Sequence, residues 1–195
     1  KSRAIVLHSF KFGEDKIIVD LFTEEQGRVS FVAPISTSPK AKIKKLYFQP
    51  FSILDIEYDY RQNKSLQRFK YVGIAFMYDS LQYDSYKLAI SLFLAEFTYY
   101  AIRDEQKNIP LFAYVMNSLQ WLDGSNGSFS NFHLVYMIHL LKFIGFYPNL
   151  DDYENGFCFD LRNGCYISMP PFHRDYLSAE DTTLLATFCR MDYSN

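Results

Sequence analysis

The spacing of apolar residues changes near residue 78, and this change constrains the fold more than any other feature of the sequence. Before residue 78, apolar residues alternate in short runs rich in Val, Ile and Phe, as expected for half-buried strands. After it they recur at helical spacing, for example at Leu88, Leu92, Ala95 and Ile102. The sequence therefore predicts a β part followed by an α part.

The β part contains five predicted strands. Gly-containing turn signals at residues 12–15 and 25–27 separate the first three strands. Five short strands in one domain close well only if the sheet curls, which predicts a small barrel. Alternation in the fourth strand places Leu54, Ile56, Tyr58 and Tyr60 on its core face. The predicted strands cover residues 3–8, 16–22, 28–33, 50–60 and 64–72.

The α part contains four predicted helices and one irregular segment. Pro110 suits the first turn of the second helix, and Ser130 is a candidate N-cap for the third, which is apolar almost all round. Residues 151–168 are predicted to form an irregular hairpin. We expect an α+β protein with a barrel domain at 1–76 and a helical domain at 77–195. The predicted helices cover residues 85–105, 110–122 and 132–146, with the last beginning at Ser178.

Composition indicates a folded protein of the cytoplasm. The chain has 195 residues, of which 49% are hydrophobic and 22% charged, a balance that supports a packed core. No apolar run approaches the length of a membrane span, and no signal peptide is recognisable. Three cysteines without framework spacing predict free thiols in a reducing compartment.

Catalytic motifs are not evident. The sequence contains neither a P-loop nor a dinucleotide-binding glycine motif. His133 and His139 are six residues apart, which does not place two metal ligands on one helical face. Cys158 and Cys165, with His173 downstream, lack the close pairing typical of a zinc knuckle. We therefore expect no enzymatic activity and no metal.

Charge is divided unevenly along the chain. Residues 1–70 hold 13 Lys and Arg against 8 Asp and Glu, although the whole chain has a net charge of −2. Four of these lysines fall within PKAKIKKL, between the third and fourth predicted strands. A basic barrel is typical of proteins that bind an anionic partner, and small barrels of this kind bind oligonucleotides. The predicted DNA-binding residues are Lys40, Lys42, Lys44, Lys45, Arg3, Lys16, Arg28, Arg68 and Lys70.

Two further points concern how this basic surface would be used. Tyr47, Phe48 and Tyr71 are candidates to stack on bases, although most aromatic residues of the barrel are predicted to pack inside it. The alternative is a protein-interaction adaptor whose basic barrel binds an acidic protein. Competition by single-stranded DNA distinguishes the two.

Three stretches resemble the RecO family of recombination mediators. FGEDKIIVDLFTEEQGRV (residues 12–29) is similar to the family's opening hairpin, and LYFQPF (46–51) to the element that leads into its fourth strand. GFYPNL (145–150) is similar to the helix exit ahead of its zinc region. The matches occur in the family's order and span about three-quarters of the chain.

The resemblance implies an N-terminal OB fold, a helical C-terminal domain and no enzyme activity. It implies binding of single- and double-stranded DNA, annealing of complementary strands and, with RecR, loading of RecA onto DNA covered by single-stranded DNA-binding protein. Many family members hold zinc with four cysteines. Here DYENG (152–156) and NGCYIS (163–168) stand where the two cysteine pairs would be. We expect the hairpin's shape to be kept without metal.

The acidic helical half should repel DNA, which makes it the candidate protein-docking half, and the resemblance implies its partner. Its expected partner is the acidic and hydrophobic C-terminal tail of single-stranded DNA-binding protein, which requires an apolar pocket with a cation at its rim. We expect the protein to act at the nucleoid in the cytoplasm. The family usually continues beyond the region matched, so we also expect a longer natural C-terminus. The candidate cations for the tail are Lys87, Arg103, Lys107 and Lys142.

Overall fold

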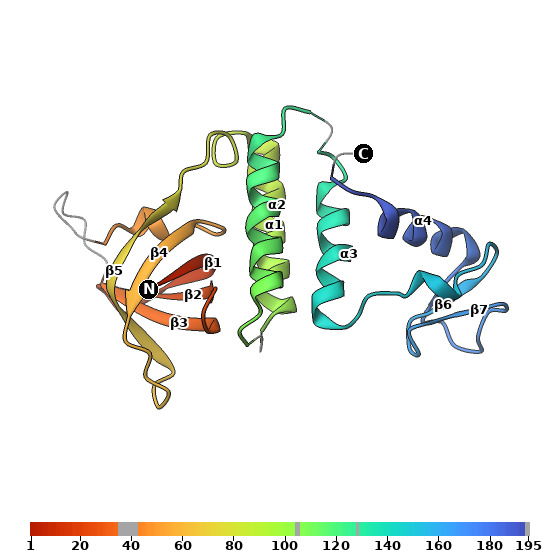
Figure 1. The fold of residues 1–195 in the computed structure, drawn as a ribbon, viewed down its shortest axis with the longest axis horizontal. Helices are drawn as coiled ribbons and strands as arrows, with labels where there is room; N and C mark the ends of the chain where they lie inside the picture. The colour runs from red at the N-terminus through yellow and green to blue at the C-terminus, as the bar shows by residue number, and fades with distance from the viewer. Residues whose placement is uncertain (35–42, 104–105, 128, 194–195) are drawn as a thin grey trace. The chain divides into compact units, whose positions relative to one another are not determined.

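The computed structural model describes residues 1–34, 43–103, 106–127 and 129–193. It divides into two compact units, residues 1–126 and 127–195, which are described separately. Five strands of the first unit form a closed barrel in the order β1-β2-β3-β5-β4 (Figure 1). The strands are β1 (Ser2–Phe12), β2 (Lys16–Thr23), β3 (Gly27–Pro34), β4 (Ile53–Tyr58) and β5 (Leu66–Phe76).

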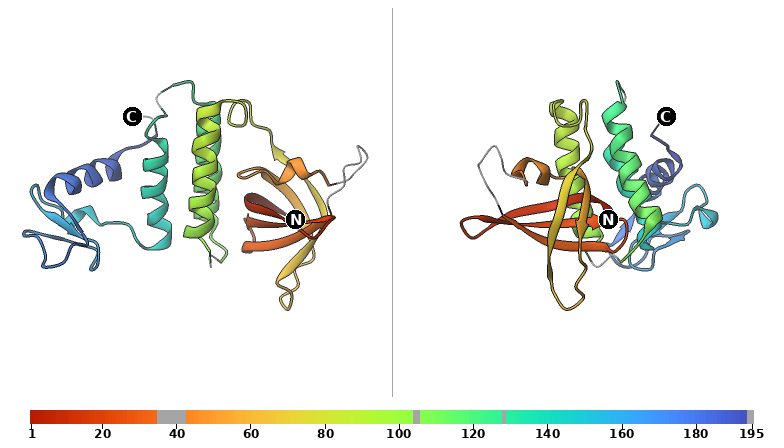
Figure 2. Two further views of the ribbon diagram at one scale, coloured as in Figure 1. Left: turned by 180° about the vertical axis from the view of Figure 1, so that it is seen from behind. Right: turned by 60° about the vertical axis from the view of Figure 1, so that its left-hand side comes forward.

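The pairing of the strands is that of an OB fold. β1 pairs antiparallel with both β2 and β4, and β3 pairs with β5 in parallel. The parallel pair closes the barrel, so the β3–β5 seam brings Val32 opposite Arg68. Figure 2 shows the curl of the five strands from two further directions. The predicted fold class is confirmed.

Alternating apolar residues fill the barrel. On β3, Val29, Phe31 and Ala33 are buried, whereas the residues between them are partly exposed. The ring of Phe69 stacks on that of Phe31, with centroids 4.4 Å apart. Tyr58 packs against this core as predicted. The prediction for Tyr60 is wrong: β4 ends at Tyr58, and Tyr60 lies beyond it, 50% exposed.

Two helices complete the first unit. α1 (Ser85–Ala101) begins at Asp84, whose carboxylate accepts the backbone N–H groups of Tyr86 and Lys87. α2 (Ile109–Gly124) begins at Asn108 and carries Pro110 in its first turn, as predicted. Both helices contact the barrel: α1 packs against β1, and the ring of Phe112 lies 5.7 Å from that of Phe22. The predicted domain boundary at residue 76 coincides with the end of β5, whereas the compact unit extends to residue 126 because these helices belong to it.

The second unit combines two helices with a small sheet. α3 (Phe132–Ile144) ends at Gly145, which adopts a left-handed conformation with φ of 79°. Ser130 is not its N-cap; Asn131 occupies that position without a side-chain capping bond. A three-stranded sheet follows, in the order β7-β6-β8, with β6 (Cys158–Asp160), β7 (Cys165–Ile167) and β8 (Tyr176–Leu177). α4 (Ala179–Arg190) is capped by Ser178, where the sequence predicted its start.

Candidate nucleic-acid interface

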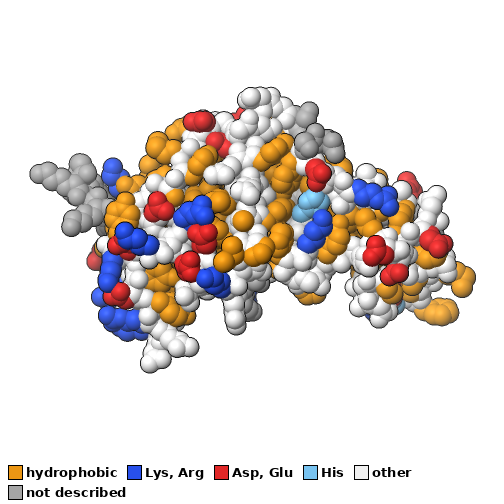
Figure 3. Space-filling model, viewed as in Figure 1, with side chains coloured by type: hydrophobic (Ala, Val, Ile, Leu, Met, Phe, Trp, Pro, Cys, Tyr) orange, Lys and Arg blue, Asp and Glu red, His pale blue; other side chains and the backbone are white. Residues whose placement is uncertain are grey.

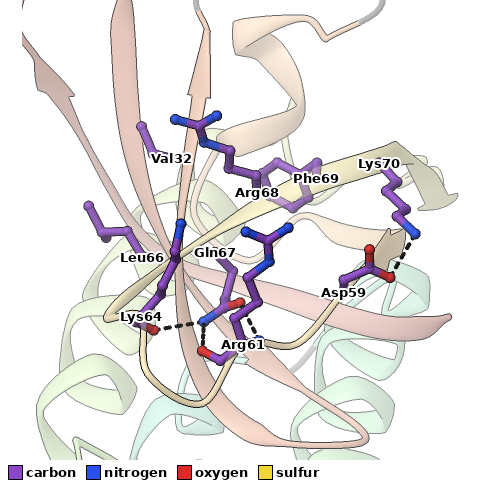
Figure 4. A pocket seen from close by; sticks show the side chains of 9 residues that line it. All are labelled: Val32, Asp59, Arg61, Lys64, Leu66, Gln67, Arg68, Phe69 and Lys70. Carbon is purple, nitrogen blue, oxygen red and sulfur yellow. Dashed lines mark hydrogen bonds and ion pairs between the residues drawn. The ribbon is translucent and has the colours of Figure 1, made fainter.

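A basic cleft runs beside the parallel β3–β5 seam. The cleft encloses about 440 Å³ and is formed by the β4–β5 loop and the first half of β5 (Figure 4). Around it stand four cations: Arg61 and Lys64 from the loop, and Arg68 and Lys70 from the strand. We call these four residues and the cavity they surround the cation cleft. Lys and Arg side chains are visible over the barrel in Figure 3, with acidic side chains among them.

A buried glutamine shapes the loop that carries two of the cations. Gln67 is 3% exposed. Its side-chain carbonyl accepts the N–H of Arg61 at 3.0 Å, and its amide nitrogen donates to the carbonyls of Arg61 at 3.0 Å and Lys64 at 2.8 Å (Figure 4). These bonds satisfy loop backbone groups near the barrel wall. The bonds tie the loop to β5, with Arg61 and Lys64 at the cleft.

Most of this positive charge is not neutralised by the protein. In the described ranges, Arg61, Lys64 and Arg68 make no ion pair and no side-chain hydrogen bond. Lys70 differs, because its ammonium group lies 2.6 Å from the carboxylate of Asp59. The hydrogen bond from Lys70 holds the pKa of Asp59 below its ordinary value. Three cations without an ion pair on one cleft are suited to successive phosphates of a nucleic acid.

Some of the predicted DNA-binding residues meet at this surface. Arg68 and Lys70 line the cation cleft, and Lys16 lines a second cavity that shares Arg68 with it. Lys44 and Lys45 are exposed at the start of the short helix η1 (Lys45–Phe48). Lys40 and Lys42 lie outside the described residues.

Arg3 and Arg28 lie elsewhere. Arg3 donates two hydrogen bonds to the carboxylate of Glu24, at 3.1 and 2.9 Å, beside a different cavity that also holds Glu25 and Glu57. The guanidinium of Arg28 donates to the carbonyl of Tyr99 on α1 at 2.6 Å, and its side chain is 13% exposed. Neither is placed to extend the cation cleft.

Arg61 and Lys64 were missed by the sequence reasoning. Arg61 falls in the connection between the fourth and fifth predicted strands, and Lys64 was taken as the first residue of the fifth strand. The signal was present, because OB folds use the loop between strands four and five for binding.

The three aromatic residues predicted to stack on bases differ in exposure and location. Phe48 is 2% exposed and belongs to the core, and Tyr47 is partly buried against it. Tyr71 is 56% exposed, but it lines the mixed-charge cavity beside Arg3. None of the three lines the cation cleft.

The candidate cations for a partner tail occupy different environments. Lys87 is 3% exposed, and its ammonium group donates to Ser80 Oγ and to the carbonyls of Asp123 and Ser125 at 2.6–2.8 Å. It is therefore a structural lysine of the first unit. Lys107 is paired with Glu25 at 2.7 Å, Arg103 is exposed beyond α1, and Lys142 lies over the ring of Tyr147 in the second unit.

The hairpin of the second unit has side chains that hold its shape. The carboxylate of Asp160 accepts the N–H of Arg162 at 2.8 Å and the side-chain amide of Asn163 at 2.7 Å, and its oxygen lies 3.4 Å from His173 Nε2. Cys158 is buried in this hairpin and Cys165 is exposed. Two cysteines do not supply a four-cysteine zinc site, and the described residues contain no group of three metal-ligating side chains. The absence of zinc remains a prediction.

No described helix combines the length and apolar character that crossing a membrane would require. The closed five-stranded barrel, with its parallel β3–β5 pair, defines the class of protein as an OB-fold protein.

Comparison with known proteins identifies the family within that class. Residues 1–78 match the family model for the recombination protein O N terminal region, and residues 82–169 match that for its C terminal region. The chain is 42% identical over 193 residues to the DNA repair protein RecO of Phocaeicola vulgatus and 44% identical over 194 residues to that of Bacteroides fragilis. Each alignment covers 99% of this chain and 80% of the relative.

A more distant relative aligns over a similar share of both chains. The DNA repair protein RecO of Flavobacterium johnsoniae is 36% identical over 197 residues, covering all of this chain and 81% of the relative. The chain belongs to the RecO family of DNA repair proteins.

Proposed function

We propose that this protein binds single- and double-stranded DNA through the cation cleft of its OB barrel and anneals complementary strands during DNA repair. The observation that carries the proposal is the set of three unpaired cations, Arg61, Lys64 and Arg68, beside the β3–β5 seam. Phosphate contacts release condensed counterions and supply affinity without reading sequence.

Annealing follows from the same charge. Two DNA strands repel each other, and a basic surface that binds one strand lowers the cost of bringing in the second. The reaction needs no nucleophile, acid–base pair or metal, so we propose no enzymatic activity.

The proposed partners come from the family. With RecR, the protein helps to load RecA onto DNA covered by single-stranded DNA-binding protein, whose acidic tail docks on the helical part. Lys107, Arg103 and Lys142 remain candidates for that docking, whereas Lys87 is left out because it is buried. The proposed location is the cytoplasm, at the nucleoid. Titration calorimetry with a tail peptide tests the docking, and absence of heat at micromolar concentrations would refute it.

The main test is fluorescence anisotropy of a labelled single-stranded oligonucleotide across a salt series. The variant Arg61→Gln/Lys64→Gln/Arg68→Gln should lower the salt slope by about two units, since each phosphate contact contributes about 0.7 on a single strand. The matched control, Arg103→Gln/Lys107→Gln/Arg174→Gln, removes the same charge from exposed cations that do not line the cleft.

Two outcomes would refute the proposal. Equal losses in the cleft variant and the control would mean that charge, not the cleft, determines binding. Failure of single-stranded DNA to displace a bound poly-glutamate peptide would favour the protein adaptor. Annealing itself is followed by energy transfer between dyes on complementary strands, and the cleft variant should be slower than the control.

A further inference from the structure

A second cavity adjoins the cation cleft at the end of the barrel. It encloses about 420 Å³, within the range of small-molecule pockets. The two cavities share Val32, Leu66, Arg68 and Phe69, so they lie next to each other along β5 and β3. We call this second cavity the mouth cavity.

The walls of the mouth cavity are mainly apolar. Phe12, at the end of β1, is 50% exposed, and Ile43 and Leu66 add aliphatic surface. Phe69 is held in place because its ring stacks on Phe31 at 4.4 Å and lies 5.7 Å from Phe48. The cavity therefore presents one fixed aromatic ring and one partly exposed ring.

Cations stand beside these apolar walls. Lys16 is the register partner of Phe12 across the β1–β2 hairpin, and Arg68 borders the cation cleft. Both are exposed, and the described part of the chain gives neither an ion pair. An apolar cavity flanked by unpaired cations matches a nucleotide, whose base has a π-face and whose phosphate is anionic.

We infer that the mouth cavity receives one unstacked nucleobase of single-stranded DNA while the cation cleft holds the neighbouring phosphates. This inference rests on the proposed function and deepens it, because it assigns a subsite for a base rather than for the backbone. Bases of a duplex are paired and stacked, so only a single strand can fill the cavity without unpairing. The cleft accepts either form of DNA, whereas the mouth cavity gives the single strand an additional contact.

Phe12 and Phe10 provide a matched pair of variants. Both are partly exposed phenylalanines of β1, at 50% and 43%. Phe10 does not line the mouth cavity, and its ring lies 5.7 Å from His8, which packs on Tyr99. Replacing either residue removes a similar aromatic area from the surface, but only Phe12→Ala removes it from the cavity.

The experiment compares a thymidine oligonucleotide with one of equal length in which internal bases are replaced by abasic sites. The two oligonucleotides carry the same number of phosphates. Phe12→Ala should weaken binding of the thymidine strand about tenfold and leave the abasic strand unchanged, as expected for the loss of one stacking contact. Phe10→Ala should leave both unchanged. Arg68→Gln should weaken both strands similarly, because phosphate contacts do not depend on the base.

The outcomes separate this inference from the proposed function. If wild type binds neither strand nor a duplex, the proposed function fails. If wild type binds both strands equally, or Phe12→Ala binds the thymidine strand like wild type, the inference fails and the function stands. Equal losses from Phe10→Ala and Phe12→Ala would also refute the cavity as the site. Urea denaturation of each variant shows that a loss of binding is not a loss of folding.

Discussion

The guanidinium of Arg28 lies over the ring of Tyr99, 4.1 Å from its centroid, and donates a hydrogen bond to the carbonyl of the same residue at 2.6 Å. The guanidinium also lies 3.8 Å from the carboxylate of Asp20, which is 6% exposed and accepts a hydrogen bond from Ser30. Arg28 thus joins β3 to α1.

The first prediction concerns the role of Arg28. Arg28→Met should lower the free energy of unfolding by about 2–4 kcal/mol, because it removes a partly buried hydrogen bond and leaves Asp20 without its cation. The same change at the exposed Arg3–Glu24 pair should cost less than about 1 kcal/mol. Urea denaturation measures both. The folded Arg28→Met protein should keep the wild-type salt slope for single-stranded DNA; a slope lower by about 0.7 would mean that Arg28 contacts a phosphate.

The second prediction concerns the acid within the cation cleft. Asp59→Asn should tighten binding of single-stranded DNA at low salt, because it frees Lys70 and removes a carboxylate that repels phosphate. The salt slope should become steeper by about one phosphate contact. Asp55→Asn makes the same change of charge at an exposed position of β4 that does not line the cleft. An equal gain in both variants would show only a response to net charge.

The third prediction concerns acid stability. The carboxylate of Asp123 accepts the N–H groups of Asp79, Ser80 and Leu81 at 2.7–3.0 Å. Burial would raise the pKa of Asp123, but these three bonds and the charge of Lys87 outweigh it, so the pKa lies below its ordinary value. A depressed pKa in the folded state contributes stability above the unfolded value of about 3.9, and this stability is lost as pH falls through the folded pKa.

Asp123→Asn should therefore be less stable than wild type at neutral pH, and the difference should shrink as pH falls below about 4. Urea denaturation at a series of pH values measures the difference. A constant difference from neutral pH to about pH 3 would contradict the role assigned to the carboxylate.

The fourth prediction concerns zinc and thiols. Cys165 is exposed, whereas Cys158 and Cys189 are each 5% exposed, and burial raises the pKa of the Cys189 thiol. A thiol reagent should modify one cysteine rapidly in the native protein and all three after unfolding, because the thiolate is the reactive form. Cys165→Ser should abolish the rapid phase. Elemental analysis should find no stoichiometric zinc; zinc that protects Cys165 until a chelator is added would refute the prediction.

The sequence was sufficient to predict the strands and helices, but it did not show which charged side chains stay exposed in the folded protein. Alternation identified the five strands, and helical spacing with Pro110 and Ser178 identified the four helices and their approximate limits. Arg28 and Arg68 look equivalent in the sequence, since both occupy non-core positions of strands. Only the packing of α1 distinguishes them, because α1 contacts Arg28 and leaves Arg68 exposed.

The burial of Lys87, on α1, could not be predicted from the sequence either. Lys87 precedes an amphipathic pattern and resembles a solvent-facing lysine, but two of its acceptors lie 36 and 38 residues further along the chain. Such a contact has no local signal. The loop cations Arg61 and Lys64 could have been predicted, because OB barrels use the loop between strands four and five for binding.

The parallel β3–β5 pair has a consequence for the order of folding. Val32 and Arg68 are neighbours across the seam, so the cation cleft forms only after the chain between them has folded back. Closures between distant segments are slow compared with hairpins such as β1–β2. During synthesis, β5 is the last strand of the barrel to leave the ribosome. The nascent protein therefore acquires its cation cleft late, after the rest of the barrel has been made.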